Sequence, residues 1–209
     1  MLILVVAIVI VVIGDLVART AAQDQLANRA QKATDAQAAS ATIYSFPFLF
    51  RLLVEGSVSQ IDLHLSDVPV GPLRLSAVDL VAHGTTIDRA ALFSQHKIRV
   101  LTIDSAKATV VVTAAELSSA VGMPMALPGG GRIEMEVSGI FVPASVQFLN
   151  GDVLQVRAAG ALVLSEDLSQ SPLVPPCALA LTVREDKITA SCRIQPVPSS
   201  VLAAFSGAG

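Results

Sequence analysis

Histidine is the first candidate for chemistry, because it titrates near neutral pH and binds metals. The chain has three, His64, His83 and His96, and they are scattered without the spacing of metal ligands. No H-E-x-x-H, C-x-x-C, G-x-S-x-G or G-x-G-x-x-G motif occurs in the sequence. We therefore interpret each histidine as a solvated residue of a strand or loop.

Two further groups could carry acid/base chemistry or hold a phosphate. Glu134 and Glu136 are two residues apart on an expected strand, so they share one wet face and are typical of solubilising charges. The segment PGGGR, residues 128–132, does not connect a strand to a helix as a phosphate loop does, which favours a plain turn. The sequence therefore predicts no catalytic residue, no metal and no cofactor, and we expect a protein that is not an enzyme.

The two cysteines are compatible with export and leave two alternatives open. If residues 177–194 form a hairpin that turns on Glu185 and Asp186, Leu179 faces Cys192 and Cys177 lies one diagonal step away. A diagonal pair is about 7–8 Å apart, at or beyond the reach of a disulfide. A longer loop or a bulge would bring the two sulfurs together. The pair is therefore either a disulfide or two buried free thiols.

The composition restricts the class of partner. The chain has 209 residues, of which 53% are hydrophobic and 15% charged, with a formal net charge of −3. Because it lacks a Lys/Arg cluster, nucleic-acid binding is not expected. The apolar excess could line a slot wide enough for acyl chains, or the same residues could simply pack against each other.

The N-terminus accounts for part of the apolar excess. Residues 1–14 are uncharged and would reach about 20 Å as a helix, against about 30 Å for a hydrocarbon core. We expect residues 1–17 to be a hydrophobic anchor or signal-like segment that is not cleaved, followed by a single domain over 18–209. A buried core strand is the alternative for the apolar run. Segment 15–40 is Ala-rich and contains no Gly or Pro, which predicts a helix.

From Ala41 onward, alternating patterns predict strands with one dry and one wet face. The runs 59–66, 132–142 and 153–164 alternate, and their lengths favour a strongly coiled sheet. A three-residue loop ending at Asp152 keeps one face apolar and opposes Phe148 to Leu154. A phase switch at Ala77–Val78 predicts a bulge or bend. A capping box, formed by Thr113 and Glu116 and closed by Gly122, predicts a helix.

The segment from Ser40 to Gly122 resembles the LmeA-like family of actinobacterial envelope proteins. The resemblance rests on "SFPFLFRLLVEGSVSQIDLHLSDVPVGPLRLSAVDLVAHGTTI" and on "TIDSAKATVVVTAAELSSAVG". It implies an α+β, TULIP-like lipid-binding module, in which a long N-terminal helix is wrapped by a strongly curved antiparallel sheet. It also implies phospholipid binding in the cell envelope, on the outer (periplasmic) side of the cytoplasmic membrane, with lipid transport as one role.

The stretch YSFPFLFRLLVEG, from Tyr44 to Gly56, concentrates aromatic residues in a chain with seven Phe, one Tyr and no Trp. We predict a strand end, then a helical turn with Pro47 at its first position and Gly56 as its C-cap. Helical spacing places Leu49, Leu52 and Leu53 on one face and Phe50 and Val54 on another. The turn is expected either to rim the mouth of the slot or to be plain core.

The resemblance, together with the apolar N-terminus and the possible apolar slot, implies a membrane-anchored envelope protein that binds, and could transfer, phospholipid, glycolipid or another acyl lipid. The expected headgroup residue is Arg51. The expected lipid-contacting residues are Phe46, Phe48, Leu49, Phe50, Leu52, Leu53, Val54, Ile61 and Leu63. The alternative is a structural or adaptor domain with a filled core that holds envelope biosynthetic enzymes. An enzyme of lipid or glycan metabolism is a third, less favoured, hypothesis.

Overall fold

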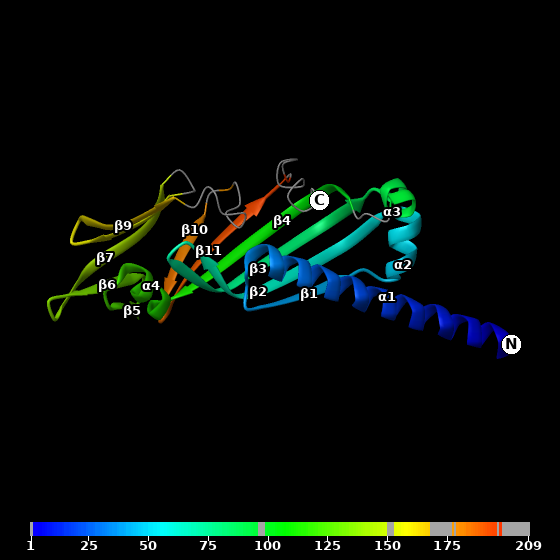
Figure 1. Ribbon diagram of the computed structural model, residues 1–209, viewed down its shortest axis with the longest axis horizontal. Helices are drawn as coiled ribbons and strands as arrows, with labels where there is room; N and C mark the ends of the chain where they lie inside the picture. Colours follow the sequence, from blue (N-terminus) through cyan, green and yellow to red (C-terminus); the bar gives the residue numbers. More distant parts are fainter. Residues whose placement is uncertain are drawn as a thin grey trace.

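The computed structural model of the chain describes residues 2–95, 99–149, 153–167, 177, 179–195 and 197. Over these residues it is an α+β structure with a long N-terminal helix and two open antiparallel sheets (Figure 1). The six-stranded sheet has the order β1 (Ala38–Tyr44), β2 (Ser57–Val70), β3 (Leu73–Ile87), β4 (Val100–Thr113), β11 (Lys187–Ile194) and β10 (Ala180–Arg184). The five-stranded sheet has the order β5 (Met125–Gly129), β6 (Arg132–Val137), β7 (Ile140–Leu149), β8 (Val153–Ala158) and β9 (Ala161–Asp167). The predicted class is confirmed, although the strands form two sheets where one was expected.

The first helix, α1 (Leu2–Thr34), joins the apolar run and the Ala-rich segment without a break. It ends before Asp35, whose φ of 52° is left-handed, so the predicted helix over 15–40 is too long at its C-terminal end. In Figure 1 its N-terminal part projects past the end of the six-stranded sheet. No helix in the described part of the chain combines the length and the apolar character needed to cross a membrane.

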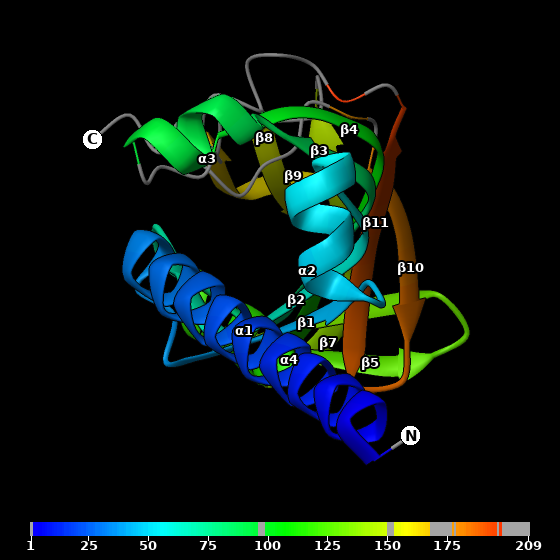
Figure 2. The same ribbon diagram turned by 90° about the vertical axis from the view of Figure 1, so that its right-hand side faces the viewer.

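The six-stranded sheet has one apolar face, which we call the inner face. Directly paired residues share a face, so the register defines rows across the strands. Three such rows are apolar: Ala39–Leu65–Val78–Val110–Ala190, Ala41–Leu63–Leu80–Ala108–Cys192 and Ile43–Ile61–Ala82–Ala106–Ile194. Helix α1 lies along this face at the β1 edge, as Figure 2 shows, and packs there through Ala18, Ala22 and Ala30. The opposite face carries polar rows such as Ser40–His64–Asp79–Thr109–Ser191.

Two predicted long strands are hairpins. The run 132–142 turns at Ser138 and Gly139, with φ of 55° and 82°, and the run 153–164 turns at Ala159 and Gly160, with φ of 48° and 84°. A two-residue turn reverses the phase of the alternation, because Val137 pairs with Ile140 and Ala158 pairs with Ala161. Phe141 and Leu162 happen to continue the period-two pattern of the preceding strand in the sequence, so the pattern did not reveal the turns. Strands β2, β3 and β4 are long as predicted, with 14, 15 and 14 residues.

One prediction about strand register is confirmed, and one predicted irregularity takes another form. The opposition of Phe148 to Leu154 is confirmed, and Leu149 pairs with Val153, which leaves three residues between the strands. The phase switch near Ala77 is present, because Leu75 and Val78 are both buried, yet the β2–β3 register is continuous through it. Asp67, with a φ of 55°, lies in β2 at the same level, so both strands change phase together and no bulge is needed.

Short helices complete the described part. They are α2 (Phe48–Phe50), the π-helical η1 (Arg51–Glu55), α3 (Arg89–Gln95) and α4 (Ala114–Val121). The capping box of α4 is confirmed: the Thr113 amide donates to Glu116 Oε2 at 2.6 Å, and Gly122 ends the helix with a φ of 75°. The predicted turn at 128–132 is also confirmed, as the β5–β6 hairpin.

Three buried clusters form the core. The main cluster lies where α4 and the five-stranded sheet meet the inner face, around Leu65, Leu117 and Met135. A second lies around Cys192 and Ile103. A third lies under α2, around Phe48 and Val58. Different elements therefore cover different parts of the inner face.

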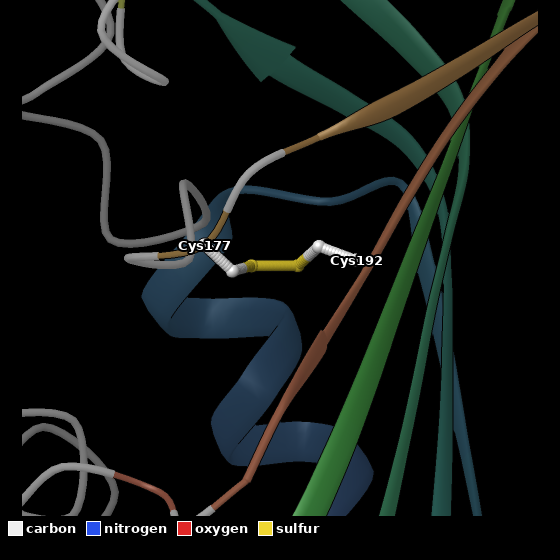
Figure 3. The surroundings of a disulfide bond; sticks show 2 residues. All are labelled: Cys177 and Cys192. Atoms are coloured by element: carbon white, nitrogen blue, oxygen red, sulfur yellow. A yellow bond between two sulfur atoms is a disulfide. The ribbon is translucent and has the colours of Figure 1, made fainter.

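The two cysteines form a disulfide, which settles the open alternative (Figure 3). The predicted hairpin on Glu185 and Asp186 is confirmed, because Arg184 pairs with Lys187. Cys177 precedes the first paired residue of β10, so it is not held at the diagonal position of a regular strand. Its Cα lies 6.0 Å from that of Cys192, within the range that a disulfide spans.

Loss of the disulfide should destabilise the fold. We expect the double variant Cys177→Ser/Cys192→Ser to lose about 3 kcal/mol of unfolding free energy, because the bond closes a loop with a separation of 15 residues. Urea unfolding monitored by circular dichroism measures this. Reductant should lower the midpoint of the wild type and leave that of the double variant unchanged. Equal midpoints for the wild type with and without reductant would contradict the expectation.

Candidate functional site

The aromatic stretch forms one end of the six-stranded sheet. Strand β1 ends at Tyr44, Pro47 is the N-cap of α2 with a φ of −66°, and Gly56 ends η1 with a left-handed φ of 67°. Pro47 therefore lies one position earlier than predicted, and the C-cap is confirmed. A Cβ on Gly56 would lie 3.1 Å from the carbonyl oxygen of Ile87, whose amide donates to Gly56 O at 2.7 Å. Glycine is required here both by the backbone angle and by this close approach.

The short helical segment has a buried and an exposed side, as expected for either a mouth or a core position. Phe48 is 4% exposed and belongs to the third cluster, against which Leu49 and Leu52 also pack. Phe50 and Val54 are 54% and 53% exposed. Two phenylalanines two positions apart thus point to different surroundings.

One predicted face is wrong in detail. Leu53 was grouped with Leu49 and Leu52 by α-helical spacing, yet it is 39% exposed. The backbone from Arg51 to Glu55 is π-helical, and the wider i→i+5 turn rotates later residues away from α-helical positions. Nothing in the sequence pattern marked this change of helix type.

The two strand residues predicted for the site lie in different places. Ile61 is half-buried and packs against the third cluster, below α2. Leu63 is 9% exposed and belongs to the main cluster, further along the inner face. Phe46 is 67% exposed, outside both clusters. The structure thus groups Ile61 with Phe48, Leu49 and Leu52, and separates Leu63 from them.

Arg51, the predicted headgroup residue, already has partners. Its Nη1 donates to Ser59 Oγ, and its Nε lies 3.9 Å from Glu55 Oε2. Both members of the ion pair are more than a third exposed, so the pair adds little stability. The guanidinium is nevertheless held along the helix surface and not aimed at the inner face.

A buried carboxylate that sequence reasoning missed joins α1 to this end. Asp15 is 4% exposed, and its Oδ1 accepts a hydrogen bond of 2.6 Å from the amide of Leu49. The first amides of a helix have no partner within the helix, and a carboxylate is a favourable one. Asp15 follows the apolar run directly, and in the sequence it signalled only the start of the charged part of the helix.

Exposed apolar side chains gather at this same end, where Figures 1 and 2 show α1 beside α2. We call this surface the apolar end. Its residues on α1 are Val11, Val12, Ile13, Leu16 and Val17, and those on the aromatic stretch are Tyr44, Phe46, Phe50, Leu53 and Val54. Exposed apolar groups are common singly, whereas ten of them on two neighbouring segments favour an interaction surface.

The remaining candidates for chemistry lie on solvated surface. His64 Nδ1 lies 2.6 Å from Asp79 Oδ1, and its Nε2 lies 3.2 Å from Ser66 Oγ. This order resembles a catalytic triad, yet the His64 and Asp79 side chains are 50% and 46% exposed on the flat polar face of the sheet. His64 is thus a solvated strand residue, as predicted. Among the described residues, no group of His, Cys, Asp or Glu could hold a metal ion.

One pocket of the described residues lies away from the apolar end. It has a volume of about 190 Å³ and is lined by Pro72, Arg74, Ala115, Glu116 and Ser119. Ligand pockets usually hold roughly 300–1,000 Å³ and are mostly apolar. At about 190 Å³, this depression beside α4 is too small to hold the acyl chains of a lipid.

Comparison with known proteins supplies the family. A family model described as LmeA-like phospholipid-binding matches residues 13–207, well beyond the segment whose motifs carry the resemblance. Comparisons with curated proteins and with solved structures found no match. The matched range leaves out only the first twelve and the last two residues, and it includes the apolar end, the inner face and the disulfide. The chain belongs to the LmeA-like phospholipid-binding family.

Proposed function

We propose that this protein binds a phospholipid, or another acyl lipid, along the inner face of the six-stranded sheet, and that the apolar end meets the membrane from which the lipid comes. The observation that carries the proposal is the close succession of exposed and buried apolar side chains at the apolar end. The exposed Phe50 and the buried Phe48 belong to one short helix that closes the inner face. A lipid tail that leaves a bilayer at Phe50 would therefore meet the inner face within one short helix.

The inner face suits an acyl chain. Apart from Cys192, its rows are built of Ala, Val, Leu and Ile, so the face offers hydrocarbon contacts to a ligand. Burial of a hydrocarbon chain there would stabilise the complex by about 25 cal/mol for each Å² of apolar surface removed from water. A helix laid along a long antiparallel sheet is also the arrangement that a TULIP-like module would have.

The site of action that we propose is the outer side of the cytoplasmic membrane, in the cell envelope. The Cys177–Cys192 disulfide supports this, because structural disulfides persist in oxidising compartments. The exposed side chains of α1 from Val11 to Val17 support attachment of the N-terminal segment to the membrane. Movement of lipid between membranes would follow from reversible binding.

A second candidate function is that of a non-catalytic adaptor in envelope glycolipid biosynthesis. Its support is a second group of exposed apolar residues on the five-stranded sheet, at Ile140, Phe141 and Leu162. Such a surface fits a protein partner as well as a lipid one. A filled inner face that takes up no lipid would favour this function.

Lipid binding is tested on protein purified without detergent. We expect native mass spectrometry to find a phospholipid-sized adduct, and added phospholipid to raise the unfolding midpoint in proportion to the logarithm of its concentration. Release of the adduct by organic extraction, followed by rebinding, would show that the site is exchangeable. Protein that never carries lipid and never exchanges labelled phospholipid would overturn the proposal in favour of the adaptor.

Membrane contact is tested by changing exposed rings only. We expect Phe46→Ser/Phe50→Ser to lower binding to phospholipid vesicles at least tenfold, because in the wild type each ring would move from water into the bilayer. The unfolding midpoint should not change. Phe141→Ser, which changes an equally exposed ring on the other sheet, is the matched control and should bind vesicles like the wild type. An equal loss of vesicle binding in Phe141→Ser would show that any exposed ring contributes, and would contradict a specific role for the apolar end.

The buried ring behaves differently. Phe48→Ser should cost about 3–5 kcal/mol of unfolding free energy, because it empties the third cluster and buries a hydroxyl. Thermal unfolding of Phe48→Ser beside Phe50→Ser therefore separates core from mouth within one helix. A stable Phe48→Ser protein would show that Phe48 does not support the fold.

A further inference from the structure

Three buried polar atoms at the apolar end have no hydrogen-bond partner among the described residues. They are Ser45 Oγ, Thr85 Oγ1 and Arg19 Nε, and the residues Ser45 and Thr85 are only 3% and 2% exposed. A fourth such atom, Arg157 Nε, lies on the other sheet, where the same guanidinium donates to Gly160 O and Gln155 Oε1. Folded proteins leave few buried hydroxyls unpaired, because such a group loses the hydrogen bonds that it makes to water in the unfolded chain.

The three residues come from three elements that surround the third cluster. Thr85 on β3 is paired with Val58 of that cluster on one side and with Ile103 on the other. Ser45 directly follows Tyr44, the last paired residue of β1, and lies between Ile43 and Phe48 of the cluster. Ser45 and Thr85 are thus both next to residues of the third cluster, which α2 covers.

Arg19 approaches the same cluster from α1. It lies next to Ala18, which packs on the cluster, and one helical turn after Asp15. The carboxylate of Asp15 is engaged by the Leu49 amide at 2.6 Å, and no ion pair joins it to Arg19 within the described residues. The Arg19 guanidinium therefore brings a positive charge to the edge of an apolar cluster.

The chemistry of the three groups defines what they would bind. An arginine Nε can only donate, and each hydroxyl can donate one hydrogen bond. The complementary ligand has several acceptor oxygens and a negative charge, which describes a phosphodiester with its neighbouring ester oxygens. Arg51, in contrast, is held by Ser59 and Glu55 on the outer surface of η1.

We propose that Ser45, Thr85 and Arg19 form a polar subsite that holds the phosphate and ester oxygens of a phospholipid, whose acyl chains then lie along the inner face. This subsite rests on the proposed function and gives it a specificity: a phosphate-bearing lipid is retained better than a lipid with the same chains and no phosphate.

The test uses the full chain and pairs each hydroxyl variant with a nearby control. Thr85→Val and Ser45→Ala remove the two unpartnered hydroxyls with little change of shape. Thr86→Val removes a half-buried hydroxyl from β3, Ser40→Ala removes an exposed hydroxyl from β1, and both serve as controls. The probes are dioleoyl phosphatidylglycerol, dioleoylglycerol and glycerol 3-phosphate. Retention of each lipid after gel filtration and the unfolding midpoint of the lipid-free protein are measured.

We expect Thr85→Val and Ser45→Ala each to lower phosphatidylglycerol retention about tenfold and to leave dioleoylglycerol retention unchanged. The lipid-free Thr85→Val protein should unfold at the same or a higher temperature than the wild type, since it loses a hydroxyl without a partner. Arg19→Lys should keep more phosphatidylglycerol than Arg19→Gln. The two controls should behave like the wild type.

Other outcomes overturn the subsite in distinguishable ways. Wild type that binds neither lipid would remove the proposed function, and the subsite with it. Wild type that binds phosphatidylglycerol while Thr85→Val binds it equally, or loses both lipids equally, would remove the subsite alone. Glycerol 3-phosphate that stabilises the protein as strongly as the lipid, in a Thr85-dependent manner, would replace the lipid headgroup with a soluble phosphate ester.

Discussion

The central constraint on this structure is that a wide sheet with one apolar face must be covered from one side. Six strands at about 4.8 Å spacing make a face about 24 Å wide, whereas a helix is about 10–12 Å across. Helix α1 therefore covers only the part of the inner face nearest β1. The rest is covered by the five-stranded sheet with α4, by α2, and by Cys177, Leu179 and Val197 at the second cluster.

Divided cover explains why the apolar end differs from an ordinary core edge. At the main cluster two sheets meet, and Leu65, Met135 and Val156 have no exposed surface. At the third cluster the cover is a short helix whose outer side is itself apolar. The boundary between buried and exposed hydrocarbon there runs between Phe48 and Phe50, inside one helical turn. Such a boundary is where a lipid would leave a bilayer for a protein interior.

Local signals in the sequence predicted local structure well. The Thr113–Glu116 capping box, the Glu185–Asp186 turn and the Phe148–Leu154 register all depend on neighbouring residues or on one alternating face, and all are present. The two-residue turns at 138–139 and 159–160 were missed because Phe141 and Leu162 continue the alternating pattern in the sequence, although each turn places them on the opposite face. Gly139 and Gly160 mark the positive φ that the turns need.

The site was predictable in outline and not in its polar detail. Aromatic density located the apolar end, and helical spacing separated the exposed Phe50 and Val54 from the half-buried Leu49 and Leu52. Contacts between distant segments could not be read in this way. The Asp15–Leu49 bond spans 34 residues. Ser45, Thr85 and Arg19 are distant in sequence and are related only because the end of β1, β3 and α1 lie around one cluster.

The composition of α1 makes that long-range bond important. The helix meets the sheet through Ala18, Ala22 and Ala30, which allow a close approach but bury little hydrocarbon each. A leucine-rich helix would be held on the sheet by burial of its side chains, whereas each turn of α1 gains much less stabilisation from burial. The buried Asp15 carboxylate adds a directional contact, because a charged acceptor must stay aligned with the Leu49 amide. The positions of α1 and α2 are therefore coupled, and the two elements that form the apolar end keep a common orientation.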